Sequence, residues 1–76
     1  MKLWPQQQRP DYGLTIRQQE IITLVSHGLS NKEVARRLNL CEGTVKVHLH
    51  TIFSKIGVAN RTALAIWRVQ SISEPT

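Results

Sequence analysis

Apolar residues recur at helical spacing in four successive stretches of this 76-residue chain, and this pattern predicts an all-α domain of four helices. The clearest helix start lies at Ser30, which is followed three residues later by Glu33. A Ser and a Glu at this spacing form a capping box, in which each side chain bonds the backbone N–H of the other residue. From there a narrow apolar stripe faces a core and consists of Val34, Ala35 and Leu38.

A turn follows this short helix at Asn39. After Gly, Asn is the residue that most often adopts the left-handed conformation that ends a helix, so we expect Asn39 to end this one. Leu40 then points inward, and a second helix begins near Cys41 or Glu42. Projection at about 100° per residue places its apolar side chains in one buried arc, formed by Val45, Leu49, Ile52 and Ile56.

The opposite side of the second helix carries no acid and only one apolar residue, Val47. Hydroxyls, a Lys and a His on such a side suit the major groove of DNA. Phosphates attract the cation, base edges pair with the polar groups, and a thymine methyl contacts the Val. An ordinary solvent-facing side is the alternative interpretation. This side consists of Thr44, Lys46, Val47, His50, Thr51 and Ser54.

One further helix precedes this pair and another follows it. The preceding helix opens at Thr15, where Gln18 completes a second capping box, and it ends at Gly28. The following helix has Asn60 as its N-cap and runs from Arg61 to about Ser71. The core face of the preceding helix consists of Ile21, Leu24 and Val25.

The last helix carries two apolar faces on nearly opposite sides, which implies two partners. The broader face is expected to close the core and consists of Ala63, Leu64, Ile66 and Trp67. The narrower strip is expected to contact a second copy of the chain, with scattered surface apolar residues as the alternative. This dimer strip consists of Ala65, Val69 and Ile72.

Taken together, these elements resemble the LuxR-type helix-turn-helix domain, the four-helix DNA-binding module shared by NarL-, FixJ- and GerE-like regulators. The resemblance covers most of the chain, with each element in order. The chain departs from the family pattern at Ile16, where Pro is usual, at Gln18, where Glu is usual, and at His50, where Lys is frequent. The motifs that carry the resemblance are Leu14-Thr15, GLSNKEVARRL at residues 28–38, GTVKVH at 43–48 and KIGV at 55–58.

The resemblance implies a helix-turn-helix domain over residues 14–72, a flexible tail or linker over 1–13 and a short tail over 73–76. It also implies sequence-specific binding of double-stranded DNA by a bacterial-type transcription regulator. The recognition helix would lie in the major groove, and the C-terminal helix would pair two copies on DNA.

Site residues follow from the resemblance, position by position. Thr44 is expected to meet a phosphate, and Lys46, Val47 and His50 are expected to face base edges. Further phosphate contacts are expected from Lys32, Lys55 and Arg61. The whole set expected at the DNA is Asn31, Lys32, Thr44, Lys46, Val47, His50, Thr51, Lys55 and Arg61.

Charge supports a polyanionic partner. The chain carries a net charge of +5, and residues 30–68 hold seven Lys or Arg against two Glu, so all of the excess lies in the helix-turn-helix and the helix after it. This distribution is the electrostatic footprint of nucleic-acid binding, whose affinity falls as salt rises.

Other chemistry finds little support. No acid–base pair, phosphate loop or nucleophile motif is present, so we expect neither an enzyme nor a cofactor. His48 and His50 project about 200° apart on a helix and cannot share a metal ion. Cys41 could be a redox sensor, although a small residue filling a turn is the favoured reading. With one cysteine and no apolar run of ~20 residues, a cytoplasmic protein without a membrane segment is expected.

The expected partners are double-stranded DNA and a second copy of the chain, with RNA polymerase as a further candidate. The Gln-rich segment at residues 5–10 is typical of a linker, so an upstream receiver or ligand-binding domain outside this chain is another candidate partner. The alternative is that the chain is a stand-alone regulator. The rival function is a protein-interaction module that pairs with another regulator and inhibits it. Such a module would show no steep salt dependence with duplex DNA.

Overall fold

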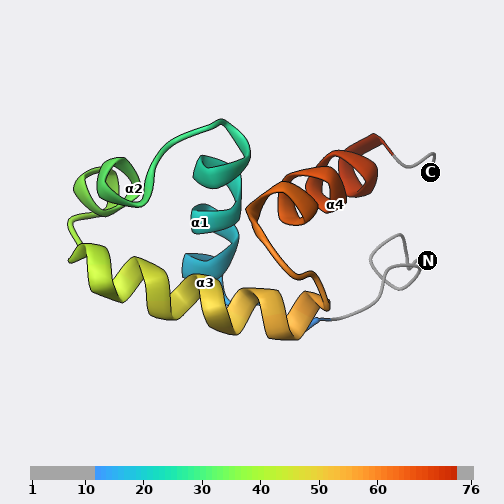
Figure 1. Ribbon diagram of the computed structural model, residues 1–76, viewed down its shortest axis with the longest axis horizontal. Helices are drawn as coiled ribbons and strands as arrows, with labels where there is room; N and C mark the ends of the chain where they lie inside the picture. The colour runs from blue at the N-terminus through green and yellow to red at the C-terminus, as the bar shows by residue number, and fades with distance from the viewer. Residues whose placement is uncertain (1–11, 74–76) are drawn as a thin grey trace, which may run out of the picture.

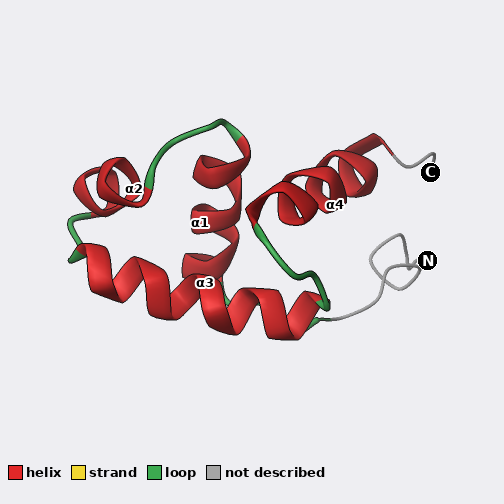
Figure 2. Ribbon diagram, in the orientation of Figure 1, coloured by secondary structure: helices red, strands yellow, loops and turns green. Residues whose placement is uncertain are grey.

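Four helices and the turns between them make up the described part of the chain, which in this computed structural model is residues 12–73, with side chains described for residues 12–70. The helices are α1 Ile16–Ser26, α2 Asn31–Leu38, α3 Glu42–Ile56 and α4 Arg61–Ser73. No strand occurs among residues 12–73 (Figure 2). The predicted all-α, four-helix fold is therefore confirmed.

The longest helix, α3, lies along one edge of the molecule, and the other three helices lie on one side of it (Figure 1). Both α1 and α2 pack against α3, whereas α4 packs against α1. The buried core takes side chains from every helix: Ile21, Ile22, Val25, Val34, Ala35, Val45, Leu49, Ile52 and Leu64. The core thus sits on the inner side of α3 and leaves its outer side uncovered.

Both predicted capping boxes form. The Thr15 hydroxyl accepts a hydrogen bond from the backbone N–H of Gln18 at 3.1 Å, and the Gln18 side chain accepts one from the Thr15 N–H at 3.0 Å. At the start of α2, the Ser30 hydroxyl accepts from the Glu33 N–H at 3.1 Å, and the Glu33 carboxylate accepts from the Ser30 N–H at 2.8 Å. Each box satisfies two N–H groups that a helix start would otherwise leave without partners.

The turn between α2 and α3 depends on Asn39, whose φ of 59° and ψ of 47° are left-handed as predicted. Among the described residues, no other residue except glycine has a positive φ. The N–H of Leu40 donates to the carbonyl of Ala35 at 2.8 Å and closes the end of α2. This conformation sets where the chain leaves α2 and therefore where α3 begins.

The fourth helix is predicted correctly at its start and differs from the prediction on its core face. The Asn60 side chain accepts from the Ala63 N–H at 2.8 Å, which makes it the expected N-cap. Leu64 is fully buried and Trp67 is partly buried against the core, but Ile66, which was assigned to the same face, is 53% exposed. The assignment of Ile66 was wrong because α4 packs mainly against α1, and this contact buries a narrower stripe than the predicted arc.

The left-handed turn gives a first prediction. Asn39→Gly should leave the melting temperature unchanged or slightly raised, because Gly adopts a positive φ without steric cost. Asn39→Val should lower the stability by roughly 1–2 kcal/mol, because a β-branched side chain clashes in this conformation. Thermal unfolding of the two variants measures the difference. Equal melting temperatures would contradict the structural role given to Asn39.

The second capping box gives a prediction about pH. The bonds that Glu33 receives, first from the backbone N–H of Ser30 and then from its hydroxyl, lower the pKa of the Glu33 carboxyl below its ordinary 4.5, and nearby Arg36 and Arg37 act in the same direction. A lowered folded-state pKa stabilises the protein above pH 4.5, and this stabilisation is lost as the pH falls through the folded-state value.

The control for this effect is Glu33→Gln, which keeps a neutral acceptor for the Ser30 N–H and cannot titrate. Between about pH 6 and about pH 3 the melting temperature of the original chain should fall more steeply than that of the variant. If the melting temperatures of both proteins fall equally with pH across this range, the carboxylate charge contributes nothing to the cap.

Candidate nucleic-acid interface

The rotation of α3 about its own axis determines which side chains it presents. Val45 and Ile52 are fully buried, Leu49 is 4% exposed and Ile56 is partly buried against the same core. All four belong to the predicted apolar arc. Because these residues face α1 and α2, the opposite side of α3 faces away from the rest of the molecule (Figure 1).

The outward side of α3 presents polar groups around a single apolar residue. Thr44, Lys46, His50 and Ser54 are exposed, as predicted, and Thr51 is half-buried. Val47 is 66% exposed. No acid occurs among these positions. The arrangement combines a cation, hydroxyls, an imidazole and an apolar group, which are the groups that contact phosphates and base edges.

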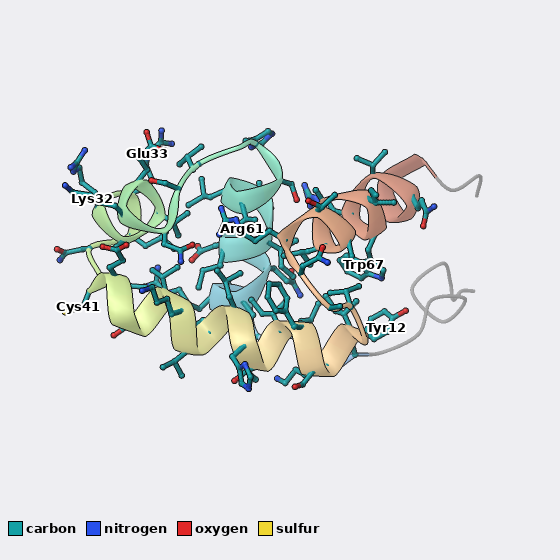
Figure 3. The ribbon with its side chains drawn as sticks, in the orientation of Figure 1. Tyr12, Lys32, Glu33, Cys41, Arg61 and Trp67 are labelled. Atoms are coloured by element: carbon teal, nitrogen blue, oxygen red, sulfur yellow. The ribbon has the colours of Figure 1, made fainter. Side chains whose placement is uncertain are left out.

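The start of α2 adds a second group of candidate residues. Lys32 is exposed and Asn31 is half-buried. Arg61, the first residue of α4, reaches across to this region (Figure 3). Its Nη1 donates to Oδ1 of Asn31 at 2.5 Å, and its Nη2 donates to the carbonyl of Leu29 at 2.6 Å. Arg61 therefore links the start of α4 to the start of α2.

Lys55, near the C-terminal end of α3, makes a second link between distant elements. Its Nζ donates to the carbonyl of Gly13 at 2.7 Å and to Oε1 of Gln18 at 3.0 Å. Gln18 is only 6% exposed and is the buried polar residue of the described part. The side chain of Lys55 is thus held between α3 and the start of α1. Its expected phosphate contact, like that of Arg61, stays a prediction.

These two links were missed by the sequence analysis. They join residues 30 to 42 positions apart, and helical periodicity reports only neighbours within a few turns. The assignment of Gln18 to the first capping box was correct, but nothing in the local sequence indicated that the same amide would also accept from Lys55.

The segment before α1 is also attached to the domain. The rings of Tyr12 and Trp67 meet edge to face, with centroids 5.6 Å apart and planes at 79° (Figure 3). Gly13 has a φ of 71° and accepts the hydrogen bond from Lys55. Contacts with the domain thus begin before the expected boundary at Leu14, while residues 1–11 of the expected tail lie outside the described residues.

The outer side of α4 carries an exposed apolar pair. Val69 is 61% exposed and Ile66 is 53% exposed, and a spacing of three residues places them on the same side of the helix. Ala65 of the predicted dimer strip is half-buried. The third member of that strip is Ile72, whose side chain is not among those that the structure describes. Ile66 was not assigned to that strip.

Comparison with known proteins places these features in a family. Residues 13–68 match the family described as "Bacterial regulatory proteins, luxR family". Within residues 12–73, no helix has the length and apolar character that crossing a membrane requires.

Three regulators illustrate the similarity. The transcriptional regulatory protein LnrK of Bacillus subtilis is 46% identical over 57 residues, which are 75% of this chain and 26% of LnrK. The CsgBAC operon transcriptional regulatory protein of Escherichia coli is 48% identical over 54 residues, 71% of this chain and 25% of that protein. The nitrate/nitrite response regulator protein NarL of Escherichia coli is 43% identical over 54 residues, again 71% of this chain and 25% of NarL.

The chain spans about a quarter of the length of these relatives. The family match nevertheless extends over all four helices up to Arg68 and includes every residue of the α3 outer side. On this evidence the chain belongs to the luxR family of bacterial regulatory proteins.

Proposed function

We propose that this chain is the DNA-binding part of a bacterial transcription regulator and that α3 enters the major groove of double-stranded DNA. The observation that carries the proposal is the outward side of α3, which is exposed, free of acids and uncovered by the other helices. The diameter of an α-helix with its side chains matches the width of the major groove. The relatives are named as transcriptional regulatory proteins and a response regulator, which agrees with this role.

In this proposal the outward side chains of α3 contact different parts of the DNA. Lys46 and His50 hydrogen-bond to base edges or phosphates, and Val47 contacts a thymine methyl. Thr44 lies in the first turn of α3, where its hydroxyl and the free N–H groups of the helix start meet a phosphate. Thr51, which is half-buried, adds a contact at the edge of the same side.

Positive charge outside α3 strengthens the attraction between the chain and the DNA phosphates. Lys32 is exposed at the start of α2, and Arg36 and Arg37 are exposed farther along the same helix. The single contact ion pair among the described side chains joins Arg17 to Glu20 on α1, so none of these α2 cations is bound directly to a carboxylate there, although Arg36 and Arg37 lie close enough to Glu33 for their charges to interact. A surface on which cations outnumber acids attracts phosphates and makes affinity depend on salt.

Pairing on DNA is the second part of the proposal. A single domain of this size reads one half-site, and helix-turn-helix proteins gain affinity by placing two recognition helices on successive turns of the duplex. The exposed residues Ile66 and Val69 on α4 support a small interface with a second copy of the chain. Because this strip is small, the free chain should be mostly monomeric and should pair on DNA. RNA polymerase and an upstream receiver or ligand-binding domain remain candidate partners of the whole regulator.

The recognition side is tested by Lys46→Ala. The ligand is a duplex that the original chain has selected from a random-sequence library. If Lys46 reaches a base edge, loss of its side chain should weaken binding to this duplex by roughly 1–3 kcal/mol. The melting temperature should not change, because Lys46 is exposed. Binding titrations at moderate salt measure the effect.

Arg17→Ala is the matched control for Lys46→Ala, because it removes one positive charge from an exposed site on α1. It should bind the selected duplex nearly as well as the original chain. Undiminished binding by Lys46→Ala would show that the groove assignment is wrong.

The pairing surface is tested by Val69→Asp. Val69 is 61% exposed, so the fold and the contact with one half-site should survive the change. Cooperative binding to an inverted repeat should be lost, because the two-fold axis places two like charges opposite each other. Gel-shift titrations on one and on two half-sites, with thermal melting in parallel, measure both properties.

Gln19→Glu adds a negative charge at an exposed position on α1, outside the strip, and should leave cooperativity intact. If Val69→Asp unfolds the chain, the strip belongs to the core. If cooperativity persists in a folded Val69→Asp variant, the copies pair through another surface.

A further inference from the structure

The position of Arg61 is unfavourable for helix stability and therefore needs another explanation. Arg61 is the first residue of α4, and its side chain extends to the first residue of α2. Helix starts carry positive partial charge and favour acidic side chains, so a cation between two of them is opposed by both dipoles. Among residues 12–73 its guanidinium makes no ion pair with a carboxylate.

The geometry of the guanidinium supplies that explanation. One nitrogen, Nη1, bonds Oδ1 of Asn31, and the other, Nη2, bonds the carbonyl of Leu29. The planar fork of an arginine can hold two acceptors in fixed relation, which the single ammonium of a lysine does not reproduce. Arg61 thus fixes both the side chain of the first α2 residue and the backbone just before that helix.

This contact also determines the orientation of the Asn31 amide. Arginine has only donors, so the atom of the amide that faces Arg61 must be the oxygen. The two hydrogens on Nδ2 of Asn31 are then left to donate elsewhere, and no described residue accepts them. Asn31 is half-buried beside the exposed Lys32, so part of its side chain is accessible to a partner from outside.

We propose that Arg61 is a positioning residue for DNA binding: it holds Asn31 so that the amide Nδ2 donates to a phosphate oxygen of the DNA backbone. This inference rests on the proposed DNA-binding function. It assigns Arg61 an effect through Asn31 in place of the direct phosphate contact expected from the family. The ligand group at Asn31 is a phosphate, which carries acceptors only and matches the free donors of the amide.

A double-mutant cycle on the whole 76-residue chain tests the inference. The variants are Asn31→Ala, Arg61→Ala and the two combined, and the ligand is a short random-sequence duplex, because phosphate contacts do not depend on base sequence. Each single change should weaken binding by about ten-fold, the loss of one hydrogen bond to a charged group. The double variant should bind no more weakly than the weaker single variant, because both changes remove the same contact.

Lys32→Ala is the matched control, because Lys32 is exposed and should contact phosphate directly. Its loss should be additive with that of Arg61→Ala, and it should lower the slope of log K against log salt by about one. Additive losses for Asn31→Ala and Arg61→Ala would overturn the inference and show that Arg61 acts on DNA by itself. If the original chain shows no salt-dependent binding at all, the proposed function fails instead.

Arg61→Lys keeps the inference testable even if Arg61→Ala melts below the assay temperature. Lysine retains the charge and can bind phosphate as a point charge. Its ammonium can bond two acceptors, as Lys55 does, but it lacks the planar fork that holds Oδ1 of Asn31 and the Leu29 carbonyl in the fixed relation that Arg61 gives them. Binding by Arg61→Lys should therefore be as weak as binding by Asn31→Ala. Binding equal to that of the original chain would overturn the inference, because only the charge of Arg61 would then matter.

Discussion

Burial of the apolar arc of α3 is the constraint on which the other features of this domain depend. Val45, Leu49 and Ile52 face α1 and α2 and leave at most 4% of their surface exposed. Burying side chains of this kind contributes about 1.5–3 kcal/mol each. Rotating α3 by one residue would expose them and would bury Lys46, whose charge is costly to remove from water. The rotation of α3, and with it the composition of the outward side, is therefore strongly determined.

The outward side of α3 is useful only if the helix is also held at both ends relative to its neighbours. At its C-terminal end, Lys55 binds the Gly13 carbonyl and the Gln18 amide, which connects α3 to the start of α1. Near its N-terminal end, the left-handed Asn39 sets the exit from α2, and Arg61 holds the start of α2 from α4. Lys55 and Arg61 both bond neutral acceptors here, so their positive charges continue to contribute to the field around the interface.

The two departures from the family pattern in α1 have physical consequences that the structure makes visible. Ile16 is 77% exposed, so the core makes no demand on the residue type at this first helical position. Gln18 retains the capping function of the usual Glu and adds a buried amide oxygen that accepts from both the Thr15 N–H and Lys55 Nζ. At 6% exposure a carboxylate would cost more to desolvate than the neutral amide, but it would also form an ion pair with the Lys55 ammonium.

The sequence by itself determined the four helices, both capping boxes, the left-handed Asn39 and the outward side of α3. All of these follow from groups within a turn or two of one another, so periodicity and cap chemistry suffice to predict them. Only the tertiary structure decided that Ile66 joins Val69 on the outer side of α4, that Tyr12 meets Trp67, and that Lys55 and Arg61 link distant elements. These features depend on how helices far apart in the chain pack together, and the local sequence does not encode which long side chain will reach which acceptor.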